Sequence, residues 1–192
     1  MKSILLSIKP KWVAKILNGE KTIEIRKTCP TQLRGDTPVK PEPIDVYIYC
    51  TKKGFLYYLK SMLSWAFRKN YCKGGFNGKV VAKFTLNKVE EIKTNLAMRF
   101  FTESANEKEL LEKSCLNSDQ LFWYLAPQEL KVKCCGYAWH IDDLVIFDKP
   151  KKLSEFKKNN STGNCWKCKL FGSGCSTCQL TKAPQSWCYV EV

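Results

Sequence analysis

The order of apolar and polar residues predicts a chain built mainly from short strands. Within residues 20–27 (EKTIEIRK) the two classes alternate from Thr22 to Arg26, which is the pattern of a strand with one buried face. Runs rich in β-branched and aromatic residues recur along the chain. The expected strands are 20–27, 44–50, 79–89, 136–141, 144–148 and 187–192.

Helices are expected at fewer places. The pair Lys9-Pro10 opens one, because the fixed φ of proline suits the first helical position, and Gly19 ends it. The others are expected near 55–71, after a capping box formed by Ser104 and Glu107, and from Ser118.

Strands outnumber helices and do not alternate with them, which argues against a doubly wound parallel sheet. The pattern predicts an α+β fold, a mostly antiparallel β-barrel with peripheral helices. A length of 192 residues suits a single domain. Two insertions are expected within it, a basic helical one at 51–74 and a cysteine-rich one at 160–182, before the last strand.

The net charge of the chain limits the classes of partner that we expect it to bind. There are 32 Lys and Arg against 18 Asp and Glu, so the formal net charge is +14 with the single histidine neutral. Such a surplus predicts attraction to polyanions, with nucleic acid favoured over a membrane. Because His140 is the only histidine, metal sites with several histidines are excluded.

The cysteines and the first residues predict the compartment. The five-residue N-terminal segment Ile4–Ile8, apolar except for Ser7, is too short for a signal peptide, and no run approaches the ~18 apolar residues of a membrane span. Most of the eleven cysteines are therefore expected as reduced thiols, in a cytoplasmic protein without a membrane partner.

Positive charge is concentrated in the first half of the chain. Residues 46–89 hold nine cations and no acid, with ten aromatic residues among them. Cations neutralise phosphates and aromatic rings stack on unpaired bases, so the segment is a candidate surface for single-stranded nucleic acid. The alternative is a helix with an aromatic core face and a solvated lysine face. The cations proposed to hold phosphate are Lys52, Lys53, Arg68 and Lys69.

The strand expected at 20–27 carries a polar row. Thr22, Glu24 and Arg26 alternate with two isoleucines, so they share one face, and Lys21 lies at its rim. A guanidinium donates in a planar fork and a carboxylate accepts from an amino group, so this row is suited to reading a base edge. The same residues also fit chemistry at Lys21, or an ion pair on a solvated edge.

The motifs around this row resemble those of ASCH domains, a branch of the PUA-like superfamily. A glycine, lysine and arginine in the pattern Gly19-x-Lys21-x-x-x-x-Arg26 follow a short helix, as they do in that family. Further matching segments are spread over nearly the whole chain. They are 7–10, 16–26, 78–82, 136–141, 147–150, 153–156 and 184–191.

The resemblance implies a PUA-like β-barrel with a cleft that takes RNA or a modified nucleobase. Some small ASCH proteins are amidohydrolases that remove an acyl group from N4-acetylcytidine with a lysine, a threonine and a distant glutamate. Lys21 matches that lysine, but Glu24 stands where the family has its threonine. We therefore expect a nucleic-acid-binding module, with the amidohydrolase acting through Lys21 and Glu24 as the alternative. Candidates for the distant glutamate are Glu107, Glu109 and Glu112.

Two further aromatic or titratable residues are candidates. His140 is a structural strand residue or a general base oriented by Asp142 or Asp143. Trp187, near the end of the chain, is a core residue or a stacking platform beside the polar row.

Four cysteines form two C-x-x-C turns separated by six residues. Two such turns facing each other give the tetrahedral set of thiolates that Zn²⁺ accepts. A closed site of this kind would stabilise an insertion too small to fold alone. The alternatives are metal-free or disulfide-linked cysteines and an iron–sulfur cluster. The expected structural zinc ligands are Cys165, Cys168, Cys175 and Cys178.

We predict that the purified chain carries one zinc ion. Native mass spectrometry should show the mass of one bound zinc, and Cys168→Ser should lower the occupancy because a closed site then lacks one thiolate. Cys188→Ser, outside the two turns, is the control. A mass equal to that of the bare chain, or one lowered by disulfide formation, would contradict the prediction.

Overall fold

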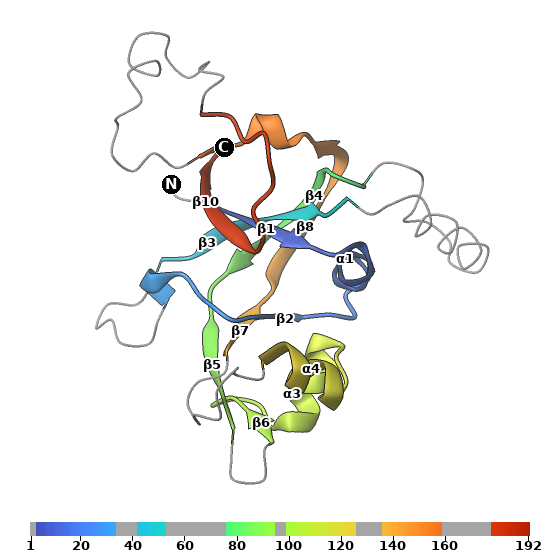
Figure 1. Ribbon diagram of the computed structural model, residues 1–192, viewed down its shortest axis with the longest axis vertical. Helices are drawn as coiled ribbons and strands as arrows, with labels where there is room; N and C mark the ends of the chain where they lie inside the picture. Colours follow the sequence, from blue (N-terminus) through green and yellow to red (C-terminus); the bar gives the residue numbers. More distant parts are fainter. Residues whose placement is uncertain (1–2, 34–41, 53–75, 95–98, 126–135, 159–177) are drawn as a thin grey trace, which may run out of the picture. The chain divides into compact units, whose positions relative to one another are not determined.

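The structure is a computed structural model in which six stretches of the chain are described (Figure 1). They are residues 3–33, 42–52, 76–94, 99–125, 136–158 and 178–192.

The chain divides into two compact units. The first consists of Met1–Ala14, Ile44–Phe84 and Leu144–Val192, and the second of Lys15–Pro43 and Thr85–Asp143. The division falls inside the first helix, α1 (Pro10–Leu17). Each unit is built around its own sheet.

The first unit holds most of a mixed sheet in which six strands are described. Its central strand β1 runs parallel to β3, with Leu5 opposite Tyr47, and antiparallel to β10, with Leu5 opposite Cys188. The order across the sheet is β8 (Asp142–Lys151), β4 (Val80–Leu86), β3 (Ile44–Cys50), β1 (Ser3–Ile8), β10 (Trp187–Glu191) and β9 (Lys157–Lys158).

Packing in this unit explains the position of β1. All six of its residues are buried, as expected for a strand with neighbours on both edges and both faces covered. A core cluster brings together Leu5 and Tyr47, and Phe156 packs edge-on against the Tyr47 ring at 5.1 Å. Phe156 follows the short 3-10 helix η2 (Leu153–Glu155).

The second unit holds a four-stranded sheet and two helices. The strand order is β2 (Ile23–Arg26), β7 (Gly136–His140), β5 (Val89–Thr94) and β6 (Phe100–Phe101), with antiparallel neighbours. The helices are α3 (Glu107–Ser114) and α4 (Ser118–Leu125), and the 3-10 helix η1 (Thr31–Leu33) follows β2.

One face of this sheet packs against the two helices. Ile23 and Ile25 of β2 form a core cluster with Leu110 of α3 and with Leu121 and Leu125 of α4. The prediction that the isoleucines of this strand face the core is therefore confirmed. Because side chains alternate along a strand, Glu24 and Arg26 belong to the opposite face.

Most of the expected elements are present, but one expected strand is divided, and the strands β1, β6 and β9 were not expected. The strand expected at 79–89 is in fact two, because β4 ends at Leu86 and β5 begins at Val89. Between them the side chain of Asn87 donates to the carboxylate of Asp142, and the backbone carbonyl of Lys88 accepts a hydrogen bond from the backbone amide of His140. The fully buried strand β1 was not among the expected strands.

The helix cap expected at Ser104 is wrong. The side chain of Asn106 accepts from the amide of Glu109, and the Glu109 carboxylate accepts from the amide of Asn106, so these two form the capping box. Ser104 is not available because its hydroxyl donates to Glu90 at 2.7 Å. The start at Ser118 is confirmed.

The α+β class is confirmed, but the described strands form two open sheets and not a closed barrel. The insertion expected at 51–74, with its helix near 55–71, lies outside the described residues except at its first two positions. Only the end of the insertion expected at 160–182 is described. There Leu180 is buried and its amide donates to Phe156.

No helix within the described stretches is long and apolar enough to cross a membrane.

Gly136 generates a stability prediction. A Cβ added to it would lie 2.6 Å from Cδ2 of Leu125 and 2.8 Å from the carbonyl oxygen of Arg26. Since backbone cannot yield as a flexible side chain does, Gly136→Ala should lower the free energy of unfolding by about 1–3 kcal/mol, measured by urea denaturation. Glu112→Ala on the exposed side of α3 should change it by less than about 0.5 kcal/mol. Equal stabilities would contradict the close packing at Gly136.

Candidate functional site

The predicted polar row forms a buried ionic cluster in the second unit. Lys21 is 3% exposed, and Glu24 and Arg26 are each 7% exposed. One oxygen of Glu24, Oε1, lies 2.8 Å from Nη2 of Arg26, and the other, Oε2, lies 3.3 Å from Nζ of Lys21. We call these three residues the triad.

Local structure explains how the triad forms. The helix α1 ends at Leu17, and Gly19 takes a positive φ of 73°, which suits glycine and turns the chain back. The amides of Glu20 and Lys21 then both donate to the carbonyl of Lys15. This turn delivers Lys21 to the start of β2, three residues before Glu24.

The ammonium of Lys21 is surrounded by acceptors. Its Nζ donates to the carbonyl of Ser114 at 2.7 Å and to the carbonyl of Ile23 at 2.8 Å, and it pairs with Glu24. Three acceptors match the three N–H groups of a protonated lysine. The geometry therefore suits the charged form of Lys21.

The same segment closes the C-terminal end of α3. The last carbonyls of a helix need donors from outside it, and Lys113 receives the amide of Thr22 while Ser114 receives Lys21. The helix ends at Cys115, which has a left-handed conformation and whose thiol donates to the carbonyl of Glu20. A cation at this end is also favoured by the helix dipole.

Burial and charge act in opposite directions on Lys21. Burial lowers the pKa of Lys21 from its ordinary value of 10.5, because it penalises the charged amine, and the nearby carboxylate of Glu24 opposes this. The charges of the triad also affect the pKa of Tyr124 in α4. The pKa of its phenol is raised above the ordinary value of 10.0 by partial burial, and the positive charge of Arg26 opposes part of this rise.

Tyr124 is a residue that the sequence reasoning missed. It is 39% exposed, and Nζ of Lys27 lies 5.7 Å from the centre of its ring. The aromatic run 122–124 on α4 was the available signal, since an amphipathic helix rarely needs three consecutive aromatic residues.

The other expected nucleic-acid contacts are not members of the triad. Thr22 precedes β2 and is exposed, so it does not share the buried environment of Glu24 and Arg26. Trp187 belongs to β10 of the first unit, where its ring packs edge-on against Tyr189 at 5.5 Å. Lys52 is exposed, and its aliphatic stem lies against Gly78. Lys53, Arg68 and Lys69 lie outside the described residues.

Three of the four expected zinc ligands, Cys165, Cys168 and Cys175, also lie outside the described residues. Cys178 is buried. Among the residues that the structure describes, no group of three or more His, Cys, Asp or Glu side chains is arranged to hold a metal ion. The four-cysteine site stays a prediction.

A second buried carboxylate lies on the other face of the same sheet. Glu90 of β5 accepts from the amide and hydroxyl of Ser104 at 3.0 and 2.7 Å, and its Oε2 lies 2.6 Å from Nε2 of His140. Nζ of Lys88 lies 3.4 Å from Oε1 of Glu90. Burial by itself would raise the pKa of Glu90, but the hydrogen bonds from Ser104 and His140 and the charge of Lys88 outweigh it, and the pKa is lowered.

This arrangement favours the structural alternative for His140 and corrects the expectation that Asp142 or Asp143 orients it. Glu90 orients its imidazole, whereas Asp142 accepts from Asn87. The carboxylate lies between the serine and the histidine, so His140 does not activate Ser104 as in a hydrolytic triad. The arrangement ties the turn at 102–105 to β5 and β7.

Two of the three candidates for the distant catalytic glutamate make structural hydrogen bonds at the start of α3. Glu109 completes the capping box, and Oε1 of Glu107 accepts from the amide of Phe100 at 3.4 Å. Glu112 is exposed.

We predict that Lys21→Met lowers the free energy of unfolding by about 3–5 kcal/mol, because it leaves buried acceptors without their cation. Denaturation of Lys15→Met provides the control. Lys15 forms an exposed ion pair with Glu20, and its loss should cost about 0–1 kcal/mol. Similar losses in the two variants would contradict the role assigned to Lys21.

The pH dependence of these variants has a definite sign. Because the pKa of Lys21 is lowered in the folded protein, the unfolded chain binds more protons at this residue as the pH approaches 10.5. The contribution of Lys21 to stability therefore rises with pH below 10.5. In this pH range the free energy of unfolding should therefore rise more steeply with pH for the wild type than for Lys21→Met.

Comparison with known proteins supports the fold. The chain matches no protein-family model and no curated protein. Among solved structures, the ASCH protein of Zymomonas mobilis is similar, with a TM-score of 0.50 and 14% identity over 98% of this chain and 87% of that one. A serine-to-alanine variant of that protein has a TM-score of 0.49 at 14% identity, covering 98% and 88% of the two chains. The resemblance drawn from the sequence motifs is thus confirmed at the level of architecture, and the chain has the fold of an ASCH domain.

Proposed function

We propose that this chain is a nucleic-acid-binding module of the ASCH fold, whose target is single-stranded RNA or a modified nucleotide. The observation that carries the proposal is the triad, in which two cations share one carboxylate. With Lys21 protonated, the triad has a net charge of +1 in a nearly buried position.

With Lys21 protonated, the formal charges of the three triad side chains sum to +1, and positive charge of this kind attracts a phosphate or another anionic group. Phosphate contacts supply most of the affinity of a protein for nucleic acid, and the net charge of +14 favours the approach of such a ligand.

The residue types of the triad also suit a base. Arginine donates in a rigid fork to the acceptors of a base edge, and a carboxylate accepts from an amino group. The partly exposed ring of Tyr124 offers a surface for stacking. Tyr124 is close enough to Arg26 and Glu24 for their charges to affect its pKa. Thr22, exposed next to Lys21, adds a hydroxyl at the rim.

The remaining expectations are part of this proposal. Lys52, Lys53, Arg68 and Lys69 would hold phosphates of the same strand, and Trp187 would stack on a base. A cytoplasmic location and a zinc-stabilised insertion at 160–182 complete it. The basic segment 46–89 supports the phosphate part, because it holds nine cations and no acid.

One observation favours the second candidate, amide hydrolysis of an N4-acylated cytidine. Burial lowers the pKa of Lys21, which increases the fraction of neutral amine available as a base or nucleophile. Glu24, 3.3 Å away, would act as the base beside it. The hydrogen bonds from Nζ to Ser114 and Ile23 oppose this role, since the amine would have to leave one of them.

We predict that the full chain binds single-stranded RNA with an affinity that falls steeply between low and high salt, because counterions are released from the phosphates. Arg26→Lys keeps the charge and loses the planar fork, so it should retain most of the affinity and lose preference among bases. Fluorescence anisotropy with labelled homopolymers measures both. Thermal melting of the variant provides the control for folding.

The outcomes separate the two candidates. Binding that does not depend on salt, or no binding at all, would contradict the nucleic-acid proposal. Incubation with N4-acetylcytidine followed by chromatography tests hydrolysis, with Lys21→Arg as the control that keeps the charge. No product at high protein concentration would retire the enzyme candidate.

A further inference from the structure

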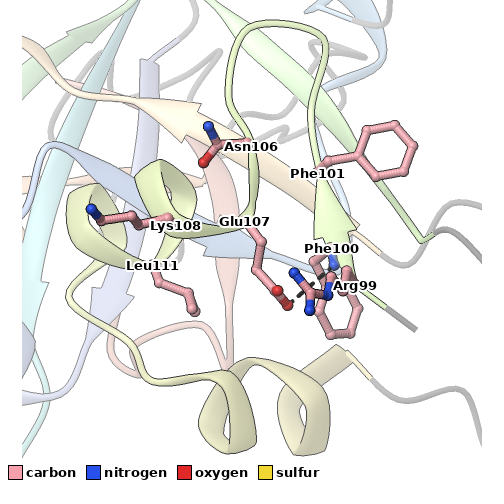
Figure 2. Close-up of a pocket in the computed structure, with 7 residues that line it drawn as sticks. All are labelled: Arg99, Phe100, Phe101, Asn106, Glu107, Lys108 and Leu111. Atoms are coloured by element: carbon pink, nitrogen blue, oxygen red, sulfur yellow. Dashed lines mark hydrogen bonds between the residues drawn. The ribbon is translucent and has the colours of Figure 1, made fainter. Parts of the chain in front are cut away.

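A pocket of about 590 Å³ lies beside β6 and α3 in the second unit (Figure 2). The ring of Phe101, at its edge, points away from α3. Lys108 lies on the other side of this helix from Arg99 and Glu107. Because these side chains do not face a common space, the pocket does not form a ligand site. The edge of the six-stranded sheet is a better-defined surface for a partner.

This sheet has an open edge at β8. Among the strands that the structure describes, β8 is the last in the order and has only β4 as a neighbour. It has ten residues, and none of them is buried. An edge strand presents a row of backbone N–H and C=O groups that can pair with a further strand. The edge of β8 is therefore a candidate surface for strand addition.

Apolar side chains follow this edge. Val145 is 47% exposed. Phe147, two residues later, is half-buried, with its ring centre 6.2 Å from that of Tyr47 and 5.3 Å from Nζ of Lys151. Because side chains alternate along a strand, Val145 and Phe147 share one face. A strand added to β8 would cover both of them.

The charges of β8 have opposite signs at its two ends. Asp142 and Asp143 stand at its start, and Lys149 and Lys151 stand at its end, where Asp148 is the only acid. A second copy of β8 in the antiparallel direction would place the acidic end of each strand beside the basic end of the other. A parallel copy would bring like charges together, which is unfavourable. Charge therefore favours antiparallel pairing of β8 with a second copy of itself.

We propose that this chain forms a two-fold symmetric dimer in which the β8 strands of two copies pair antiparallel along their open edges. A two-fold axis normal to the sheet keeps equivalent faces together, so a residue lies opposite one an even number of positions away. The register centred on Ile146 places Val145 of each copy opposite Phe147 of the other. The paired segment is 144–148, and Asp143 of each copy then lies near Lys149 of the other.

The ends of the paired segment agree with this register. Asp143 has a left-handed φ of 46°, which interrupts the regular strand just before residue 144. Pro150 has no N–H to donate and lies beyond residue 148. Both irregular positions therefore fall outside the segment that would form the new hydrogen bonds.

Lysines on an edge strand often prevent association with other strands. In β8 the lysines repel a basic strand, but Lys149 attracts Asp143 of a second copy, so the same charges select a copy of this chain. The net charge of +14 on each copy opposes association at long range. Physiological salt screens that repulsion beyond about 8 Å, whereas the paired charges are closer than this.

The test measures the mass of the full chain by analytical ultracentrifugation in about 0.15 M salt. An interface of one strand is small, so we expect a dissociation constant in the micromolar range. Over protein concentrations of about 1–200 µM, the average mass should rise from 22.2 kDa towards twice that value.

Two variants test the residues that face each other. Val145→Lys should weaken the dimer at least about tenfold, because it places a charge against the ring of Phe147 and the symmetry repeats the change. Val192→Lys is the matched control, since Val192 is 62% exposed and follows β10. Lys149→Glu should weaken the dimer about tenfold by repelling Asp143, whereas Lys158→Glu on β9 makes the same change of charge and should not. Circular dichroism checks that each variant is folded.

Hydrogen exchange locates the interface. The amides of 144–148 should become more protected as the protein concentration rises, while those of β5 in the second unit should not change. A mass that stays at 22.2 kDa over the whole range would overturn the proposal. A dimer that both Val145→Lys and Lys149→Glu leave unchanged would overturn it too, since another surface would then hold the copies together.

Discussion

The buried ammonium of Lys21 is the constraint on which the second unit depends. A charge removed from water needs acceptors for each of its N–H groups, and Lys21 obtains them from β2, from the end of α3 and from Glu24. These contacts hold the C-terminal end of α3 to the strand that carries Glu24 and Arg26. The helix end, the strand and the triad are therefore coupled, and a change in one is expected to disturb the others.

Both faces of the four-stranded sheet contain a buried carboxylate, but the two have different surroundings. Glu90 shares the face of Ile25 and Ala138, and its partners Ser104, Lys88 and His140 are consistent with a structural link between strands. Glu24 lies on the opposite face and pairs with both Lys21 and Arg26. The proposed anionic ligand is assigned to the triad, where both oxygens of one carboxylate are paired with basic side chains.

Several details could be predicted because their causes are local. Proline at the first position of α1, the glycine that follows it and the alternation of β2 depend on residues close in sequence, and they are present as expected. The cap of α3 was predicted incorrectly because Ser104 satisfies its hydroxyl with Glu90, fourteen residues earlier in the chain. The division between β4 and β5 likewise depends on contacts with β7 and β8.

The sequence by itself determined the α+β class, the ASCH resemblance, the positive charge and the grouping of Glu24 with Arg26, because periodicity, composition and motif spacing are properties of the chain alone. Only the tertiary structure decided that Lys21 is buried beside them and bound to Ser114, 93 residues away in the chain. It also decided that Glu90 orients His140 and that Arg99, Phe101 and Glu107 surround a pocket. Such contacts depend on which distant carbonyls and carboxylates the folded backbone brings within hydrogen-bond distance, and no local pattern records that.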